Sequence, residues 1–154
     1  MEVIQISASD TRALRFRVLW PHKANVEACI IDIDEAPHAI HLGSMVNGEL
    51  VGTASLFEMS HREVPGRRQY RLRAMATAPE VRGIGAGKAI VQEAIRRLKA
   101  DGYDTLWCDA RAVALGFYEN LGFEYGSDWY EIPQIGPHRR MFYRLSDQEE
   151  AEAE

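Results

Sequence analysis

The chain changes from a strand pattern to a helix pattern at Val81-Arg82-Gly83-Ile84-Gly85-Ala86-Gly87-Lys88. Three glycines at alternate positions leave the backbone without side-chain cover where the chain turns. Backbone N–H groups in such a turn, together with the N-terminus of the following helix, attract phosphate. Arg82 and Lys88 flank the turn, and the first turn of the expected helix contains no acidic residue. The segment therefore predicts a phosphate-binding turn. A glycine-rich turn that only begins a helix is the alternative.

Two other phosphate-binding motifs do not fit this segment. A P-loop requires Gly, four residues and then Gly-Lys-Ser/Thr. Here Arg82 occupies the first position and Ala89 follows Lys88. A dinucleotide motif requires Gly-x-Gly-x-x-Gly. The position of its last glycine is occupied by Lys88 when the motif is counted from Gly83, and by Ile90 when it is counted from Gly85. Both motifs are excluded.

The residues around the turn predict a mixed α/β sheet. Asn47-Gly48 is the pair that favours a type I′ hairpin turn between residues 40–46 and 49–57. Helical spacing of apolar residues runs from Ala86 to Ala100. We expect further strands at 3–6, 69–77, 105–108, 123–125 and 141–145, helices from Ser9 or Asp10 to Pro21 and over 113–120, and loops over 23–39 and 126–137.

Composition limits the class of protein. The chain has 154 residues, 46% apolar, which predicts one domain over residues 1–146. Five of its 23 acids lie in an acidic tail, residues 147–154, that we expect to be disordered. Without the tail, 18 acids balance 18 bases, which argues against nucleic acid as a partner. A basic cluster remains that is either a solvated hairpin or an anion-binding flank: His61, Arg62, Arg67, Arg68, Arg71 and Arg73.

The start of the chain and its cysteines indicate a compartment. No apolar run of signal-peptide or membrane length occurs in the first thirty residues, so we expect a cytoplasmic protein without a membrane partner. Cys29 and Cys108 lie in apolar strings far apart, which favours buried, reduced thiols over a disulfide. Neither has metal-ligand spacing, and we expect no metal site.

Three blocks of sequence together resemble one family. Arg82-x-x-Gly85-x-Gly87 is similar to the pyrophosphate signature of the GNAT superfamily of acetyl-CoA-dependent N-acetyltransferases. Residues 110–124, which contain Phe117-Tyr118-Glu119-Asn120-Leu121-Gly122-Phe123, resemble the family's block "A…FYeklGFe". Residues 135–141, which contain Pro137-His138, resemble the segment before the last strand in many members. The resemblance extends from about Asp10 to Leu145.

The resemblance implies a fold and a cofactor site. In this fold the strand ending at Thr77 splays from the strand at 105–108, and the pantetheine arm of acetyl-CoA bonds to backbone in the gap. The cofactor-binding residues implied are Met75, Ala76, Thr77, Arg82, Gly83, Ile84, Gly85, Ala86, Gly87, Lys88 and Arg111. Many relatives carry Asn where this chain has Arg111, so Arg111 ranks below the glycine segment.

Tyr118 matches the tyrosine that many family members use as a general acid toward the leaving sulfur. Packing in the core is the alternative role for this residue. The base that deprotonates the amine has no signature. Candidates are His138, Glu58 and His61, or bulk water through a short chain. A loop histidine such as His138 can equally be structural.

These observations predict direct transfer of an acetyl group from acetyl-CoA to a primary amine, without a covalent enzyme intermediate. A non-catalytic acyl-CoA-binding sensor is the second hypothesis. The partner would be a small-molecule or peptide amine, and a homodimer is a candidate assembly. We expect the acceptor side to be built from the first helix, residues 20–39 and residues 129–138. The acids Asp32, Asp34 and Glu35 either attract a cationic amine or lie in a solvated loop.

Overall fold

The computed structural model describes residues 1–146, so the predicted acidic tail lies outside the described residues. The chain divides into two compact units. The first contains Met1–Phe57 and Leu72–Ala94, and the second contains residues 58–71 and 95–146. The assignment of residues 1–146 to one domain stays a prediction.

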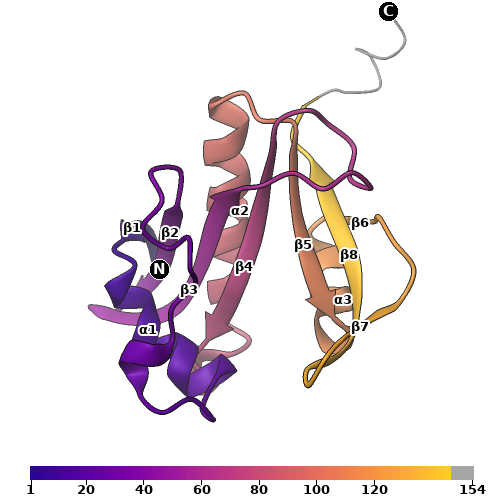
Figure 1. Ribbon diagram of the computed structural model, residues 1–154. Coiled ribbons are helices and arrows are strands. Elements are labelled where there is room, and N and C mark those ends of the chain that lie inside the picture. Colours follow the sequence, from indigo (N-terminus) through magenta and orange to yellow (C-terminus); the bar gives the residue numbers. More distant parts are fainter. Residues whose placement is uncertain (147–154) are drawn as a thin grey trace, which may run out of the picture. The chain divides into compact units, whose positions relative to one another are not determined.

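The first unit is built on antiparallel strands, shown side by side in Figure 1. β1 (Glu2–Ile6) pairs with β2 (Ile40–Val46), which pairs with β3 (Glu49–Glu58). Asn47 and Gly48 have φ angles of 51° and 79°, as a type I′ turn requires at both central positions. The predicted hairpin is confirmed, and β4 (Gln69–Thr77) has the predicted bounds.

The first helical segment differs from the single α-helix that we expected. It consists of a 3₁₀ turn η1 (Ser9–Thr11), a short α1 (Arg12–Leu14) and a π-helical turn η2 (Arg15–Leu19). Neither Ser9 nor Asp10 caps it alone. Ser7 and Asp10 instead bond reciprocally: the Asp10 amide donates to Ser7 Oγ, and the Ser7 amide donates to Asp10 Oδ2, both at 3.2 Å. This exchange gives the Ser7 amide an acceptor at the start of the segment, while the Asp10 amide also donates to the Ser7 carbonyl at 3.1 Å.

A buried ion pair lies in the segment predicted to be a solvated loop. Asp34 is 5% exposed and accepts two hydrogen bonds from Arg15, at 2.7 and 2.9 Å, while Arg15 is fully buried. Arg15 also donates to the Cys29 carbonyl and to Ser55 Oγ. Of the two roles considered for Asp34, neither fits: its carboxylate is not in a solvated loop, and it is already paired with Arg15 rather than free to attract a cationic amine. Only the short 3₁₀ turn η3 (Val26–Ala28) interrupts the irregular chain here.

Helix α2 (Ala86–Ala100) has the predicted bounds. Its apolar face packs on β3, where Gly52 permits a close approach. A Cβ at Gly52 would lie 2.5 Å from Ser44 Oγ and 3.3 Å from Ile90 Cδ1. Arg97 and Lys99 lie in the last turn, where the helix dipole favours cations.

The second unit is built around β5 (Thr105–Arg111). Gln69, Tyr70 and Arg71 of β4 pair with it in parallel, and β8 (Gly136–Arg144) pairs with its other edge in antiparallel. β6 (Glu124–Tyr125) and β7 (Tyr130–Ile132) both pair with β8. Helix α3 (Leu115–Asn120), preceded by a 3₁₀ turn η5 (Ala112–Ala114), contacts β5. Val64, Trp107 and Phe142 form a buried apolar cluster.

Two expectations for this unit are wrong. Residues 126–137 are not one loop, because they contain β7 and the start of β8. β5 continues three residues past Cys108, since β8 supplies partners as far as Arg111. The hydrogen-bonded strand order is β1-β2-β3-β4-β5-β8-β6 with β7 on β8, a mixed eight-stranded sheet, which confirms the fold class. The splay between β4 and β5 stays a prediction.

Candidate functional site

The glycine segment of the first unit forms an open turn between η4 (Pro79–Val81) and α2. Gly83 and Gly85 have φ angles of 92° and 86°, in the region that side chains rarely adopt. A Cβ built at either position would meet no atom within 4 Å. The glycines are therefore required by backbone conformation, and the space beside them is free.

The start of α2 carries uncompensated positive charge. A helix leaves its first four N–H groups without intrahelical partners. No acid lies in the first turn of α2. Within residues 1–146, neither Arg82 nor Lys88 makes an ion pair or a side-chain hydrogen bond. Ile84 is 50% exposed. These features suit an anion, and a pyrophosphate in particular.

The strand before this turn contains one unusual backbone conformation. Ala74 has a φ angle of 55°, which costs a non-glycine residue roughly 1 kcal/mol. Met75, Ala76 and Thr77, the predicted cofactor-binding strand residues, follow directly. Ala76 is buried against Leu14, while Met75 and Thr77 are partly exposed. The strained residue thus marks the start of the segment predicted to bind pantetheine.

Tyr118 lies in the second unit with its side chain buried. It is 5% exposed and packs between Phe117 and Phe123, at ring distances of 5.0 and 5.1 Å. Burial raises the pKa of its hydroxyl well above the ordinary value, and the interaction with the neighbouring Cys108 raises this pKa further. Burial also raises the pKa of the Cys108 thiol. Both groups therefore remain neutral, and the Tyr118 hydroxyl is a hydrogen-bond donor.

His138 occupies β8 rather than a loop, and it is 4% exposed. Its Nδ1 lies 2.8 Å from the Gly136 carbonyl oxygen. Because a carbonyl only accepts, Nδ1 carries a proton, and Nε2 of the neutral ring is an acceptor. The ring stacks on Tyr130 at 6.2 Å, and the strand register places His138 opposite Arg111, whose side chain is exposed.

The structure does not bring the two predicted catalytic side chains together. Residues that face each other in an antiparallel pair share a face of the sheet, and neighbours along a strand alternate. His138 is opposite Arg111, and so it lies on the face of the sheet to which the odd-numbered residues of β5 point. Cys108, which bonds Tyr118, lies on the even-numbered face. Within the second unit, Tyr118 and His138 therefore lie on opposite faces of β5.

A charged cluster that the sequence did not predict lies on the face of His138. Asp109 Oδ2 accepts from Arg71 Nη2 at 2.6 Å, and its Oδ1 accepts from the Tyr130 hydroxyl. Oδ1 also lies 3.5 Å from Arg140 Nε. Both guanidinium groups lie over the ring of Trp107, at 5.0 and 6.0 Å. Tyr130 was expected on the acceptor side, but no sequence signal connects it to Asp109.

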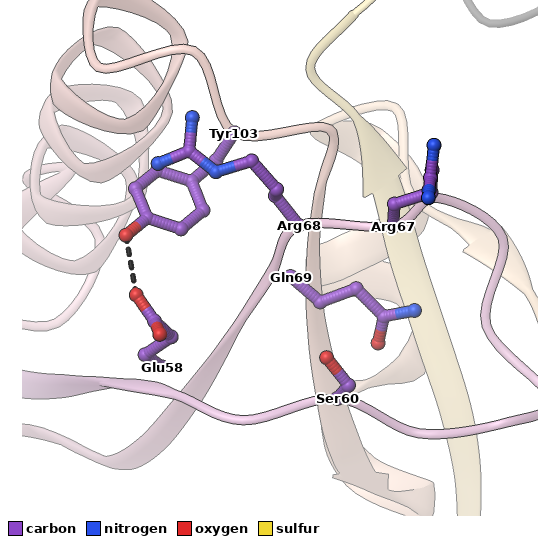
Figure 2. A pocket seen from close by; sticks show the side chains of 6 residues that line it. All are labelled: Glu58, Ser60, Arg67, Arg68, Gln69 and Tyr103. Atoms are coloured by element: carbon purple, nitrogen blue, oxygen red, sulfur yellow. Dashed lines mark hydrogen bonds between the residues drawn. The ribbon is translucent and has the colours of Figure 1, made fainter.

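The other candidate bases and part of the basic cluster have structural partners. Figure 2 shows a pocket lined by Glu58, Ser60, Arg67, Arg68, Gln69 and Tyr103. There the Tyr103 hydroxyl donates to Glu58 at 2.5 Å, and Arg68 lies 4.2 Å over the Tyr103 ring. His61 Nδ1 accepts from the Glu63 amide. Glu58 and His61 therefore fit a base less well than His138 does.

Three further properties concern the described residues only. Both cysteines are free and buried, as predicted. No group of three or more His, Cys, Asp or Glu side chains in residues 1–146 is placed to hold a metal ion. No helix in the same range is long and apolar enough to cross a membrane.

Comparison with known proteins identifies relatives over most of the chain. Residues 6–123 match the family model described as "Acetyltransferase (GNAT) family". An uncharacterized N-acetyltransferase of Bacillus subtilis, YitI, is 35% identical over 145 residues, which cover 94% of this chain and 97% of YitI. An aminoglycoside 6'-N-acetyltransferase solved with coenzyme A superposes with a TM-score of 0.74 at 14% identity, over 95% of this chain and 98% of that one. The structure of a putative N-acetyltransferase from Lactobacillus plantarum superposes with a TM-score of 0.73 at 20% identity, over 94% of this chain and 98% of that one.

Proposed function

Because this chain belongs to the GNAT family of N-acetyltransferases, we propose that it transfers an acetyl group from acetyl-CoA to a primary amine by direct attack in a ternary complex. The observation that carries the proposal is the open, positively charged start of α2. It provides amides, two cationic side chains without a side-chain partner among residues 1–146, and no acid in the first turn of the helix. A relative solved with coenzyme A supports an acyl-CoA donor.

The donor would be held by the first unit. Amides from Arg82 to Lys88 would donate to the pyrophosphate, and the Arg82 and Lys88 side chains would neutralise its charge. The backbone of residues 75–77 would bond the pantetheine amides as an added strand does. Arg111, exposed at the end of β5, is a further candidate contact in the second unit.

Transfer requires that the amine lose a proton and that the negative charge on the departing sulfur be stabilised. The amine nitrogen forms a bond to the thioester carbonyl carbon, the C–S bond breaks, and the amine loses a proton. The departing sulfur then carries negative charge, which a neutral phenol can stabilise by donating a hydrogen bond. The thiol has an ordinary pKa of about 8.5, whereas the pKa of Tyr118 lies above about 10. Full proton transfer from Tyr118 is therefore uphill, and we assign Tyr118 the role of hydrogen-bond donor to the sulfur.

His138 is the best-placed candidate for the base. Its Nδ1–H is bonded to a backbone carbonyl, which leaves Nε2 as the acceptor that a base requires. The attacking nitrogen and the departing sulfur are bonded to the same carbon during transfer. Because His138 lies on the face of β5 opposite to Tyr118, it would accept the amine proton through a short chain of water rather than by direct contact.

The test measures acetyl-CoA binding and the release of CoA thiol over a panel of polyamines, amino acids, aminoglycosides and peptide N-termini. Replacing Tyr118 by Phe should lower turnover by about 100-fold with acetyl-CoA affinity unchanged, the loss expected for one preorganised donor. Tyr125→Phe, which removes a hydroxyl bonded to Glu119 at the surface, is the matched control. Undiminished turnover in Tyr118→Phe would remove its role. Acetyl-CoA binding without thiol release from any amine would favour the sensor hypothesis.

A further inference from the structure

The charged cluster of the second unit contains more buried positive than negative charge. The side chains of Arg71, Arg140 and Asp109 are 22%, 13% and 14% exposed. Two guanidinium groups therefore share one carboxylate in a mostly buried setting. The balancing charge is Glu63, whose carboxylate lies 3.0 Å from Arg140 Nη1 and is 50% exposed. A half-exposed ion pair of this kind contributes little to stability, so Glu63 is easily displaced.

The two arginines also have unused donor capacity. Each guanidinium has five N–H donors in a planar fork that matches a carboxylate. Arg71 uses Nη1 on the thioether sulfur of Met59, a weak acceptor, at 3.4 Å. Arg140 Nη2 has no hydrogen-bond partner among residues 1–146. A carboxylate that replaced Glu63 would gain a bidentate contact with Arg140.

The position of the cluster connects it to the acceptor. Tyr130, which bonds Asp109, also stacks on His138, and His138 lies two residues before Arg140 on β8. Asp109 itself is held by two arginines and a phenol, so it is not available to a cationic amine. The face of β5 that carries the candidate base therefore presents guanidinium groups to whatever binds there.

We propose that Arg140, supported by Arg71, recognises a carboxylate on the acceptor, and that Glu63 is its internal occupant when no acceptor is bound. This rests on the proposed function and refines it: the acceptor is an amine that also carries a carboxylate, such as an amino acid or a peptide with a free acidic group. Glu63 then acts as a competitor that the acceptor carboxylate displaces.

The activity test compares an amino acid with its amide, two acceptors that differ in one charge. The full chain should favour the carboxylate by about tenfold or more in kcat/KM, the ratio for one charge-assisted hydrogen bond. Arg140→Gln should raise KM for the carboxylate only. Glu63→Gln should lower that KM about threefold or more, within the range of an exposed ion pair. Arg139→Gln alters the neighbouring residue, which lies on the other face of β8, and it should leave KM unchanged for both the carboxylate and the amide.

A binding test separates failure of this inference from failure of the proposed function. Titration with an N-acetyl amino acid and with its amide is followed by the NMR signal of the Trp107 indole N–H, which donates to the Met59 carbonyl beneath both guanidinium groups. Selective binding of the carboxylate supports the inference even if no amine is acetylated. Three results would overturn the inference: equal binding of the carboxylate and the amide, a rise in KM for both acceptors in Arg140→Gln, or an unchanged KM for the carboxylate in Glu63→Gln.

Discussion

The Arg15–Asp34 pair should be the most costly polar contact of the first unit to break. Arg15 is fully buried, and four hydrogen bonds hold its guanidinium: two to Asp34, one to Ser55 and one to the Cys29 carbonyl. Replacing Asp34 by Asn keeps the shape and one acceptor. It also removes the negative charge and points an amide donor at a guanidinium donor. A buried charge without its counterion costs about 3–5 kcal/mol.

The loss should be measured as the urea midpoint of unfolding at pH 7. With a slope of roughly 2 kcal/mol per molar urea, a loss of about 4 kcal/mol lowers the midpoint by about 2 M. Asp32→Asn is the matched control, because Asp32 is exposed in the same segment and should shift stability by less than about 0.5 kcal/mol.

A second variant tests the reason for the loss. Arg15→Met combined with Asp34→Asn removes the uncompensated charge and should be more stable than Asp34→Asn alone. The reasoning fails if Asp34→Asn costs no more than Asp32→Asn, or if the double variant is the less stable of the two.

Two further predictions concern pH. Burial raises the pKa of Tyr70, Tyr118 and Tyr130, so above pH about 10 the unfolded chain loses protons that the folded chain retains. The free energy of unfolding should therefore fall as the pH rises from 10, by at most about 1.4 kcal/mol per pH unit for each tyrosine. The fall should be less steep in Tyr118→Phe, which lacks one of the three hydroxyls. Urea unfolding between pH 9 and 11 measures both slopes, and equal slopes in the two proteins would contradict the prediction. His138→Gln should remove the acidic limb of the kcat/KM profile, and an unchanged limb would exclude His138 as the base.

Local signals in the sequence predicted the elements that local chemistry determines. Asn47-Gly48 placed the hairpin because few other residues accept positive φ at both positions. The helical spacing of apolar residues predicted both ends of α2. The glycine segment predicted an exposed turn at the start of a helix, and Gly83 and Gly85 have the backbone that only glycine adopts readily.

Contacts between distant residues were not predictable in this way. Nothing in the spacing of Arg15 and Asp34, nineteen residues apart, indicates a buried pair. β7 is three residues long and pairs only with β8, so Gly126, Gly136 and Pro137 read as loop. Asp109 directly follows the predicted strand 105–108, and its role was not predictable because Arg71, Tyr130 and Arg140 reach it from three other strands.

The alternation of β5 has a consequence for how relatives of this chain can diverge. Leu106, Cys108 and Ala110 are at most 2% exposed, and Cys108 meets α3 through Tyr118. Asp109 and Arg111 point the other way and carry charge. A mutation at Arg111, which is exposed, alters this polar face without repacking the side of the strand that meets α3, whereas a mutation at Asp109 would leave the mostly buried Arg71 and Arg140 without their shared carboxylate. Under the proposed function, the choice of acceptor therefore has an evolutionary route that leaves the folding of the strand intact.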